Sequence, residues 1–143
     1  MSSREALDPR VIAQNPLVRC INSAFQVDLL GQVNAETIGG FQVAGVGGQL
    51  DFFRGAGLAD DALSIVVLDS TTSDESRTRI VPAFEPGSVV TSTRYDVDCV
   101  VTEYGVAQLG GATVKERALS LINIAHPEFR DELEAAAREM RLV

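Results

Sequence analysis

The chain has 143 residues, a net charge of −8, 45% hydrophobic and 22% charged residues. This length suits a single domain, and the composition is that of a globular rather than a disordered protein. An acidic chain without a Lys/Arg cluster is expected to bind neither nucleic acid nor an anionic membrane. Its apolar runs are too short for a bilayer span and it begins without a secretion-signal pattern, so we expect a cytoplasmic protein.

The first half predicts an N-terminal arm followed by strands. Residues 1–16 form the expected arm, with a short helix over residues 9–14. Residues 18–29 are rich in β-branched and apolar side chains with stretches of alternation, which predicts strand structure. A tight turn near Gly31 is expected to lead into a further strand over residues 31–35.

Glycine is concentrated in the middle of the chain, where eight of the 12 glycines fall within residues 31–57. We expect a short helix over residues 49–54, ended by Gly55 and Gly57. The apolar run 64–68 predicts a strand that is covered on both faces, followed by a polar loop over residues 69–73. Residues 80–82 and 89–91 predict short strands joined through a turn at Pro86 and Gly87, and residues 97–102 predict another buried strand.

The C-terminal part predicts two helices. Thr113 and Glu116 have the spacing of a capping box, and Pro127 stands at the favoured first position of a second helix. An apolar stripe and an i,i+4 pair between Glu134 and Arg138 support that last helix. Together these elements predict an α/β fold with a mixed or mostly parallel sheet, flanking helices and two C-terminal helices.

The few cysteines and the single histidine limit the metal, disulfide and acid–base chemistry that this chain can perform. Cys20 and Cys99 are isolated in the sequence, and we interpret them as reduced and buried, with a disulfide as the alternative. One histidine and two distant cysteines give no zinc-binding spacing, so no metal site is expected. His126 precedes Pro127, which favours a joint between helices over a catalytic base.

The strongest local signal is the segment from Ala44 to Gln49, with the sequence Ala-Gly-Val-Gly-Gly-Gln. Glycines let a backbone approach a ligand closely, and a helix that starts just after them directs its free N–H groups at that space. Such a turn suits a phosphate, a carboxylate or an oxyanion, with Gly47 and Gly48 as oxyanion-hole candidates. The alternative is a tight turn where a helix packs closely on a sheet.

Charged side chains near the predicted strand ends are weaker candidates. Glu36 and Glu103 could each serve as a base or nucleophile, or be exposed or capping acids. Arg54, Arg79 and Arg94 could pair with an anionic ligand, but internal ion pairs are the expected role in so acidic a chain.

Several ordered sequence blocks resemble one known family. They are Ile-Asn-Ser-Ala at 21–24, Val-Asp-Leu at 27–29, Gly-Gln-Val-Asn-Ala-Glu at 31–36, Gly-Val-Gly-Gly-Gln at 45–49, Arg-Ile-Val-Pro at 79–82, Val-Val-Thr-Glu-Tyr-Gly at 100–105 and Ile-Ala-His-Pro at 124–127. In this order they resemble the C-terminal domain of the acetyl-CoA hydrolase/transferase family, of the 4-hydroxybutyrate CoA-transferase type. The resemblance runs from about residue 8 to residue 140.

The resemblance implies an enzyme that moves CoA between an acyl-CoA and a small carboxylic acid through a glutamyl-CoA thioester. It implies that residues 1–143 are the later part of a class I CoA-transferase-like domain. The family's nucleophilic glutamate lies on a segment preceding the block at 21–24, which leaves Glu36 only a weak catalytic candidate.

For CoA contact the resemblance implies the segment formed by Ala44, Gly45, Val46, Gly47, Gly48 and Gln49, together with the loop at Ser70. At that loop some family members use a lysine toward CoA, whereas this chain has Asp69 and Ser70. Because a partial domain exposes sheet edges and apolar faces, we expect a homo-oligomer or a partner N-terminal chain. Two alternatives stay open: a non-catalytic association module that docks onto a partner chain, and catalysis by this chain alone through Glu36 or Glu103.

Overall fold

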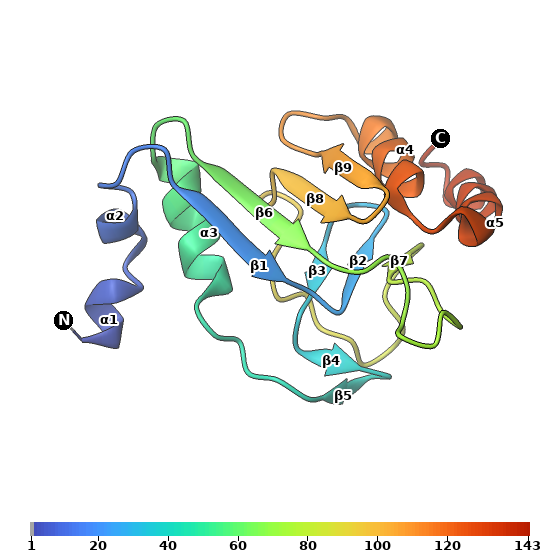
Figure 1. Cartoon of the computed structure of the whole chain (residues 1–143), viewed down its shortest axis with the longest axis horizontal. Coiled ribbons are helices and arrows are strands. Elements are labelled where there is room, and N and C mark those ends of the chain that lie inside the picture. Colours follow the sequence, from blue (N-terminus) through green and yellow to red (C-terminus); the bar gives the residue numbers. More distant parts are fainter. Residues whose placement is uncertain (1) are drawn as a thin grey trace.

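The computed structural model describes residues 2–143, except for the side chains of residues 3 and 4. Two short helices open the chain, α1 (Ser3–Ala6) and α2 (Pro9–Ile12), and they lie beside α3 (Gln49–Leu58) in Figure 1. The helix expected over residues 9–14 is confirmed over its first four residues, where the Asp8 side chain caps it by accepting from the Arg10 N–H. Met1 of the expected N-terminal arm lies outside the described residues. Within residues 2–143, no helix has both the length and the apolar character needed to cross a bilayer.

The main sheet has the strand order β1-β6-β8-β9. Strands β1 (Arg19–Ser23), β6 (Leu63–Val67) and β8 (Cys99–Thr102) run parallel, and β9 (Gly105–Gln108) is antiparallel to β8. The mixed sheet expected from the sequence is therefore confirmed. Strand β9 was not predicted.

A second, smaller sheet has the order β3-β2-β7. Strand β2 (Gln26–Asp28) pairs antiparallel with β3 (Val33–Asn34) and parallel with β7 (Ile80–Val81). The predicted turn is confirmed: Gly31 has a φ of 85°, and the buried Asp28 carboxylate accepts from the N–H groups of Leu30 and Gln32. The strand-like stretch 18–29 is thus divided between two sheets.

Strands β4 (Thr37–Ile38) and β5 (Phe41–Gln42) form a β-hairpin with a two-residue loop. Its loop residues, Gly39 and Gly40, have φ values of 60° and 77°, which a tight hairpin turn needs and glycine adopts without strain. Part of the glycine concentration is therefore explained by local turn geometry.

The prediction that α3 ends at Gly55 was wrong. The helix continues through Gly55 and Gly57 to Leu58. A Cβ atom on Gly55 would lie 2.5 Å from the Ile12 side chain, so this glycine allows α2 to pack closely on α3. A close helix approach, rather than a helix end, accounts for glycine at this position.

Two strand predictions also need correction. Residues 89–91 form no strand: Ser92 makes only an isolated bridge with Val33, and the turn at Gly87 leads into irregular chain. The strand at 64–68 is present as β6, but it is covered on one face only, because Val66 is fully buried whereas Val67 is 40% exposed.

Helices α4 (Val114–Ile124) and α5 (Pro127–Glu139) confirm the C-terminal prediction. Thr113 and Glu116 form the capping box. His126 is the N-cap of α5, and its ring lies edge-on to Tyr104 with 5.4 Å between ring centroids, which confirms it as the joint between the two helices.

One face of the main sheet carries the core. Cys20 on β1 contacts the Phe52 carbonyl in α3, and the Thr102 hydroxyl on β8 donates to the Ile124 carbonyl in α4, so both helices lie on the same face. The largest fully buried side chains of the core are Phe53, Leu29, Ile80, Leu109, Leu121 and Leu133. Cys20 and Cys99 are both free and buried, which confirms the reduced interpretation.

Candidate functional site

The glycine turn at residues 44–48 is reached through a segment that Glu36 holds in place. The Glu36 carbonyl accepts from the N–H groups of Val43 at 2.8 Å and Ala44 at 3.1 Å. Its carboxylate accepts from the Gln42 side chain at 2.9 Å, and the residue is only 7% exposed. Glu36 therefore anchors the approach to the turn, and its carboxylate already has a partner.

Beyond this anchor the main chain is open. Within the described residues, the N–H groups of residues 45–48 donate to no acceptor. Helix α3 begins at Gln49, and its N-cap Gly48 provides no side-chain hydrogen bond. A Cβ atom on Gly45 or Gly47 would meet nothing within 4 Å, so both positions face open space. Free amides and a helix N-terminus at one place favour binding of an anion or a polarised carbonyl oxygen.

Gly48, the last residue of the turn, and Gln49, the first residue of α3, also have packing roles. A Cβ atom on Gly48 would lie 2.6 Å from the Leu7 side chain, so the N-terminal arm packs directly against this glycine. The Gln49 side chain is buried and donates to the Ser92 hydroxyl at 3.0 Å. The close-packing interpretation of the glycine turn therefore applies to Gly48. No packing constraint accounts for Gly45, where the ligand-binding interpretation stays open.

Ser70 and Glu103 form a second polar cluster, where β6 and β8 end. The Ser70 N–H and hydroxyl donate to the Glu103 carboxylate at 2.9 Å and 2.5 Å, and Ser70 is fully buried. Desolvation acts to raise the pKa of Glu103, but the hydrogen bonds from Ser70 and from the Glu103 main chain, together with the nearby His126, outweigh it and lower that pKa. In this conformation the Ser70 hydroxyl is occupied, and exposed Asp69 is the side chain that the loop presents.

Ser70 and Glu103 were each named as candidates from the sequence, but the contact between them was not predicted. Each residue follows a parallel strand of the same sheet, and β6 and β8 are neighbours. The carboxyl ends of parallel strands meet at one edge, so the strand order is the signal that would have paired them.

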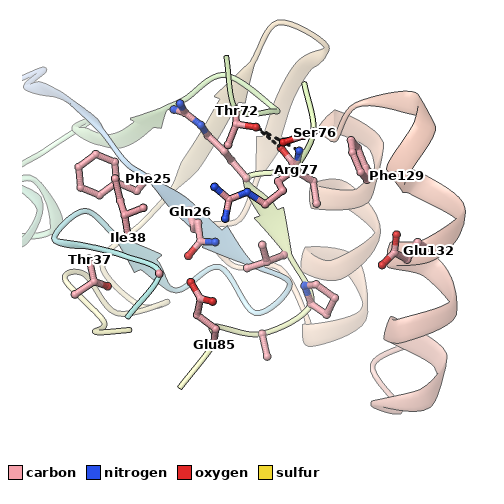
Figure 2. A pocket seen from close by; sticks show the side chains of 16 residues that line it. Phe25, Gln26, Thr37, Ile38, Thr72, Ser76, Arg77, Glu85, Phe129 and Glu132 are labelled. Atoms are coloured by element: carbon pink, nitrogen blue, oxygen red, sulfur yellow. Dashed lines mark hydrogen bonds between the residues drawn. The ribbon is translucent and has the colours of Figure 1, made fainter. Parts of the chain in front are cut away.

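A cavity of about 490 Å³ lies close to this cluster and was not predicted from the sequence. Figure 2 shows Phe25 and Ile38 on one side of it and Phe129 and Glu132 of α5 on the other. Thr72, two residues after Ser70, also lines it, so the cavity and the cluster share one loop. Residues 44–48 do not line this cavity.

The candidate arginines have different surroundings. Arg54 pairs with Asp96 at 3.5 Å, as expected for an internal ion pair. Arg94 lies over the Tyr95 ring, 5.8 Å from its centroid. Arg79 lines the cavity together with Arg77, and within the described residues neither guanidinium has a carboxylate within 4.0 Å.

This fold is found as part of longer chains in solved structures. A 4-hydroxybutyrate CoA-transferase from Porphyromonas gingivalis superposes with a TM-score of 0.78 at 39% identity, covering 95% of this chain and 30% of that one. RipA from Yersinia pestis superposes with a TM-score of 0.90 at 43% identity, covering 97% of this chain and 31% of that one. The fold is thus that of an α/β domain of the CoA-transferase class.

Sequence comparison gives the family. The 4-hydroxybutyrate coenzyme A transferase of Clostridium kluyveri is 51% identical over 126 residues, which cover 88% of this chain and 29% of that protein. The profile of the acetyl-CoA hydrolase/transferase C-terminal domain matches residues 1–137, and the chain belongs to this family. It spans about 30% of the length of the relatives that it matches.

Proposed function

We propose that this chain is the CoA-binding C-terminal portion of an acyl-CoA:carboxylate CoA-transferase or acyl-CoA hydrolase, with the nucleophilic glutamate supplied from outside these 143 residues. The observation that carries the proposal is the set of free main-chain N–H groups at residues 45–48 beside the start of α3. Its substrates are an acyl-CoA and a small carboxylic acid. The buried free thiols of Cys20 and Cys99 support a cytoplasmic location.

The turn suits the stabilisation of charge during acyl transfer. When a carboxylate attacks the thioester carbonyl, the carbonyl oxygen gains negative charge. Main-chain N–H groups that are directed at this oxygen before the attack lower the barrier. Collapse expels CoA thiolate and leaves an acyl–glutamyl anhydride. The thiolate then attacks the glutamyl carbonyl, which releases the acid and forms the glutamyl-CoA thioester; an acceptor acid reverses these steps.

Neither of the two candidate acids, Glu36 and Glu103, is well placed to replace the family's nucleophilic glutamate. The Glu36 carboxylate is buried and accepts from Gln42, and the Glu103 carboxylate accepts two hydrogen bonds from Ser70. Hydrogen bonds to a carboxylate stabilise its charged form and make it a weaker nucleophile. The proposal therefore assigns both residues to holding the loops of the site.

Binding to the turn can be tested on the chain alone. We expect CoA at millimolar concentration to shift the NMR amide signals of residues 45–49 selectively. Gly45→Ala adds a methyl group that fits sterically in the free protein but occupies the space beside the amides, so CoA affinity should fall about tenfold or more. Gly57→Ala is the matched control, because its Cβ also meets nothing within 4 Å but lies in the last turn of α3, away from residues 45–48.

The second candidate function is a non-catalytic module that docks onto a partner chain. The observation that favours it is the uncovered face of the main sheet, on which Val67 and Ile21 are 40% and 64% exposed. It predicts that CoA leaves the amides of residues 45–49 unchanged. Such a result, with Gly45→Ala indistinguishable from the wild type, would refute CoA binding at the turn.

A further inference from the structure

The glycine turn is held to the rest of the fold at each of its two ends. At the start, the Glu36 carbonyl accepts two main-chain hydrogen bonds from the segment that leads into the turn. At the end, the side-chain amide of Gln49 donates to the Ser92 hydroxyl at 3.0 Å. Between these two points the chain runs as an open loop from β5 to α3 (Figure 1), and within the described residues the N–H groups of residues 45–48 donate to no acceptor. The two end contacts therefore have to position amides that make no hydrogen bond of their own.

Ser92 is firmly held against β3. It is fully buried, its carbonyl accepts from the Val33 N–H at 3.0 Å, and its own N–H donates to the Val33 carbonyl at 3.3 Å. The preceding residue, Thr91, donates its N–H to the Val33 carbonyl at 2.8 Å, and its hydroxyl accepts from the Ala35 N–H at 2.9 Å. These hydrogen bonds keep the Ser92 hydroxyl, the acceptor for Gln49, at a fixed place in the core.

The start of the turn depends on the same part of the chain. The side-chain oxygen of Asn34, which is fully buried, accepts from the N–H groups of Glu36 at 3.1 Å and Thr37 at 2.9 Å. An asparagine that bonds the main chain two and three residues further on fixes the local turn, so the Glu36 peptide is held in place. Residues 33–36 therefore position both ends of the glycine turn, directly at its start and through the buried serine at its end.

We propose that Ser92 is a positioning residue for the glycine turn: acting through Gln49, it fixes the start of α3 and with it the direction of the free N–H groups of residues 45–48. Gln49 is the first residue of α3, and its side chain is buried. Because Ser92 is fully buried, it acts on a bound oxygen only through the turn. Donors stabilise developing charge best when their geometry is set before the charge appears. The inference rests on the proposed function, which assigns CoA binding to these amides.

The hydrogen bond between Gln49 and Ser92 can be removed without disturbing the pairing with β3. The bonds of Ser92 to β3 are made by its main chain, so Ser92→Ala deletes only the acceptor of Gln49. Ser64→Ala is the matched control. Ser64 is 2% exposed, and its hydroxyl donates to the Asp98 carboxylate at 2.9 Å. It lines a hollow together with Leu58, the last residue of α3, and so lies at the helix end remote from the turn.

The decisive measurement is the main-chain ¹⁵N NMR order parameter in the free chain. We expect residues 45–48 of the wild type to be rigid, with order parameters of about 0.85, and to fall below about 0.6 in Ser92→Ala. Ser64→Ala should leave these values unchanged. In a CoA titration followed by the same signals, Ser92→Ala should bind about fivefold more weakly than the wild type, because binding must then order the loop. Ser64→Ala should bind CoA as the wild type does.

Gln49→Met keeps the length of the side chain without its donor, so it should loosen residues 45–48 as much as Ser92→Ala, and the double variant should loosen them no further. Far-UV circular dichroism confirms the folding of each variant, and Gln49→Met serves if Ser92→Ala unfolds. Order parameters that stay at the wild-type value in these variants, or that fall equally in Ser64→Ala, would overturn the inference.

The order parameters are measured without CoA, so this inference and the proposed function fail separately. A wild-type chain whose amides at residues 45–49 do not respond to CoA would refute CoA binding at the turn. Unchanged order parameters in Ser92→Ala and Gln49→Met, in a chain that does bind CoA, would refute the positioning role alone.

Discussion

Arg117 ties three separate parts of the chain together, and its replacement should be strongly destabilising. Its guanidinium donates to the main-chain carbonyls of Leu30 at 2.8 Å, Leu109 at 2.7 Å and Arg94 at 2.6 Å. The residue is only 8% exposed. Burial, followed by the nearby charge of Arg94, lowers the pKa of the Arg117 guanidinium.

Arg117→Met keeps most of the side-chain volume but leaves the Leu30 and Arg94 carbonyls without a donor, whereas the Leu109 carbonyl still accepts from the Ala112 N–H. A buried polar group without a partner costs about 1–3 kcal/mol, and removal of the buried charge returns part of that cost. We therefore expect a loss of about 3–5 kcal/mol in the free energy of unfolding. Arg117→Lys should lose about 2 kcal/mol, because one ammonium group cannot span three carbonyls in this geometry.

The assay is urea unfolding followed by far-UV circular dichroism, since the chain has no tryptophan for fluorescence. A loss of this size lowers the urea midpoint by about 2 M. Arg10→Met is the control: its side chain is 85% exposed and pairs with Asp8 at the surface, so little change is expected. An Arg117→Met variant within about 1 kcal/mol of the wild type, with the same urea dependence, would refute this assignment.

Two further predictions concern the start of α4 and the Ser70–Glu103 cluster. Thr113→Ala removes the capping box and should cost about 1 kcal/mol in thermal or urea unfolding, whereas an unchanged midpoint would contradict the cap. Ser70→Ala should lower stability at neutral pH. Because the folded state lowers the pKa of Glu103 below its ordinary value of 4.5, this stabilisation is fully present above pH 4.5 and is lost as the pH falls through the lower folded value. Unfolding curves for wild type and Ser70→Ala should therefore converge in acid, and a gap that stays constant with pH would exclude the carboxylate as the cause.

Local signals predicted the C-terminal helices well. The capping box at Thr113, the proline at the start of α5 and the ion pair between Glu134 and Arg138, 3.2 Å apart, all depend on residues within four positions of each other. The turn at Gly31 belongs to the same group. Such features form wherever the short segment goes, so the sequence alone is sufficient to predict them.

The errors arose where distant segments meet. Gly55 was expected to end α3, but contact with Ile12 keeps it inside the helix. The prediction of a strand at residues 89–91 was wrong, because the chain there makes only an isolated bridge between Ser92 and Val33. In each case a tertiary contact, invisible to local pattern, decided between two conformations that the sequence permits.

The order of motifs along the chain was enough to place it in its family, and the sequence also predicted residues 44–49 as a ligand-binding segment. Only the folded chain separated the glycines of that segment by role, with Gly48 against Leu7 and Gly45 facing open space. It alone joined Ser70 to Glu103 and left one face of the main sheet uncovered. The physical reason is that caps and turns depend on neighbours in sequence, whereas side-chain access, buried pairing and uncovered surface depend on which strands become neighbours in space.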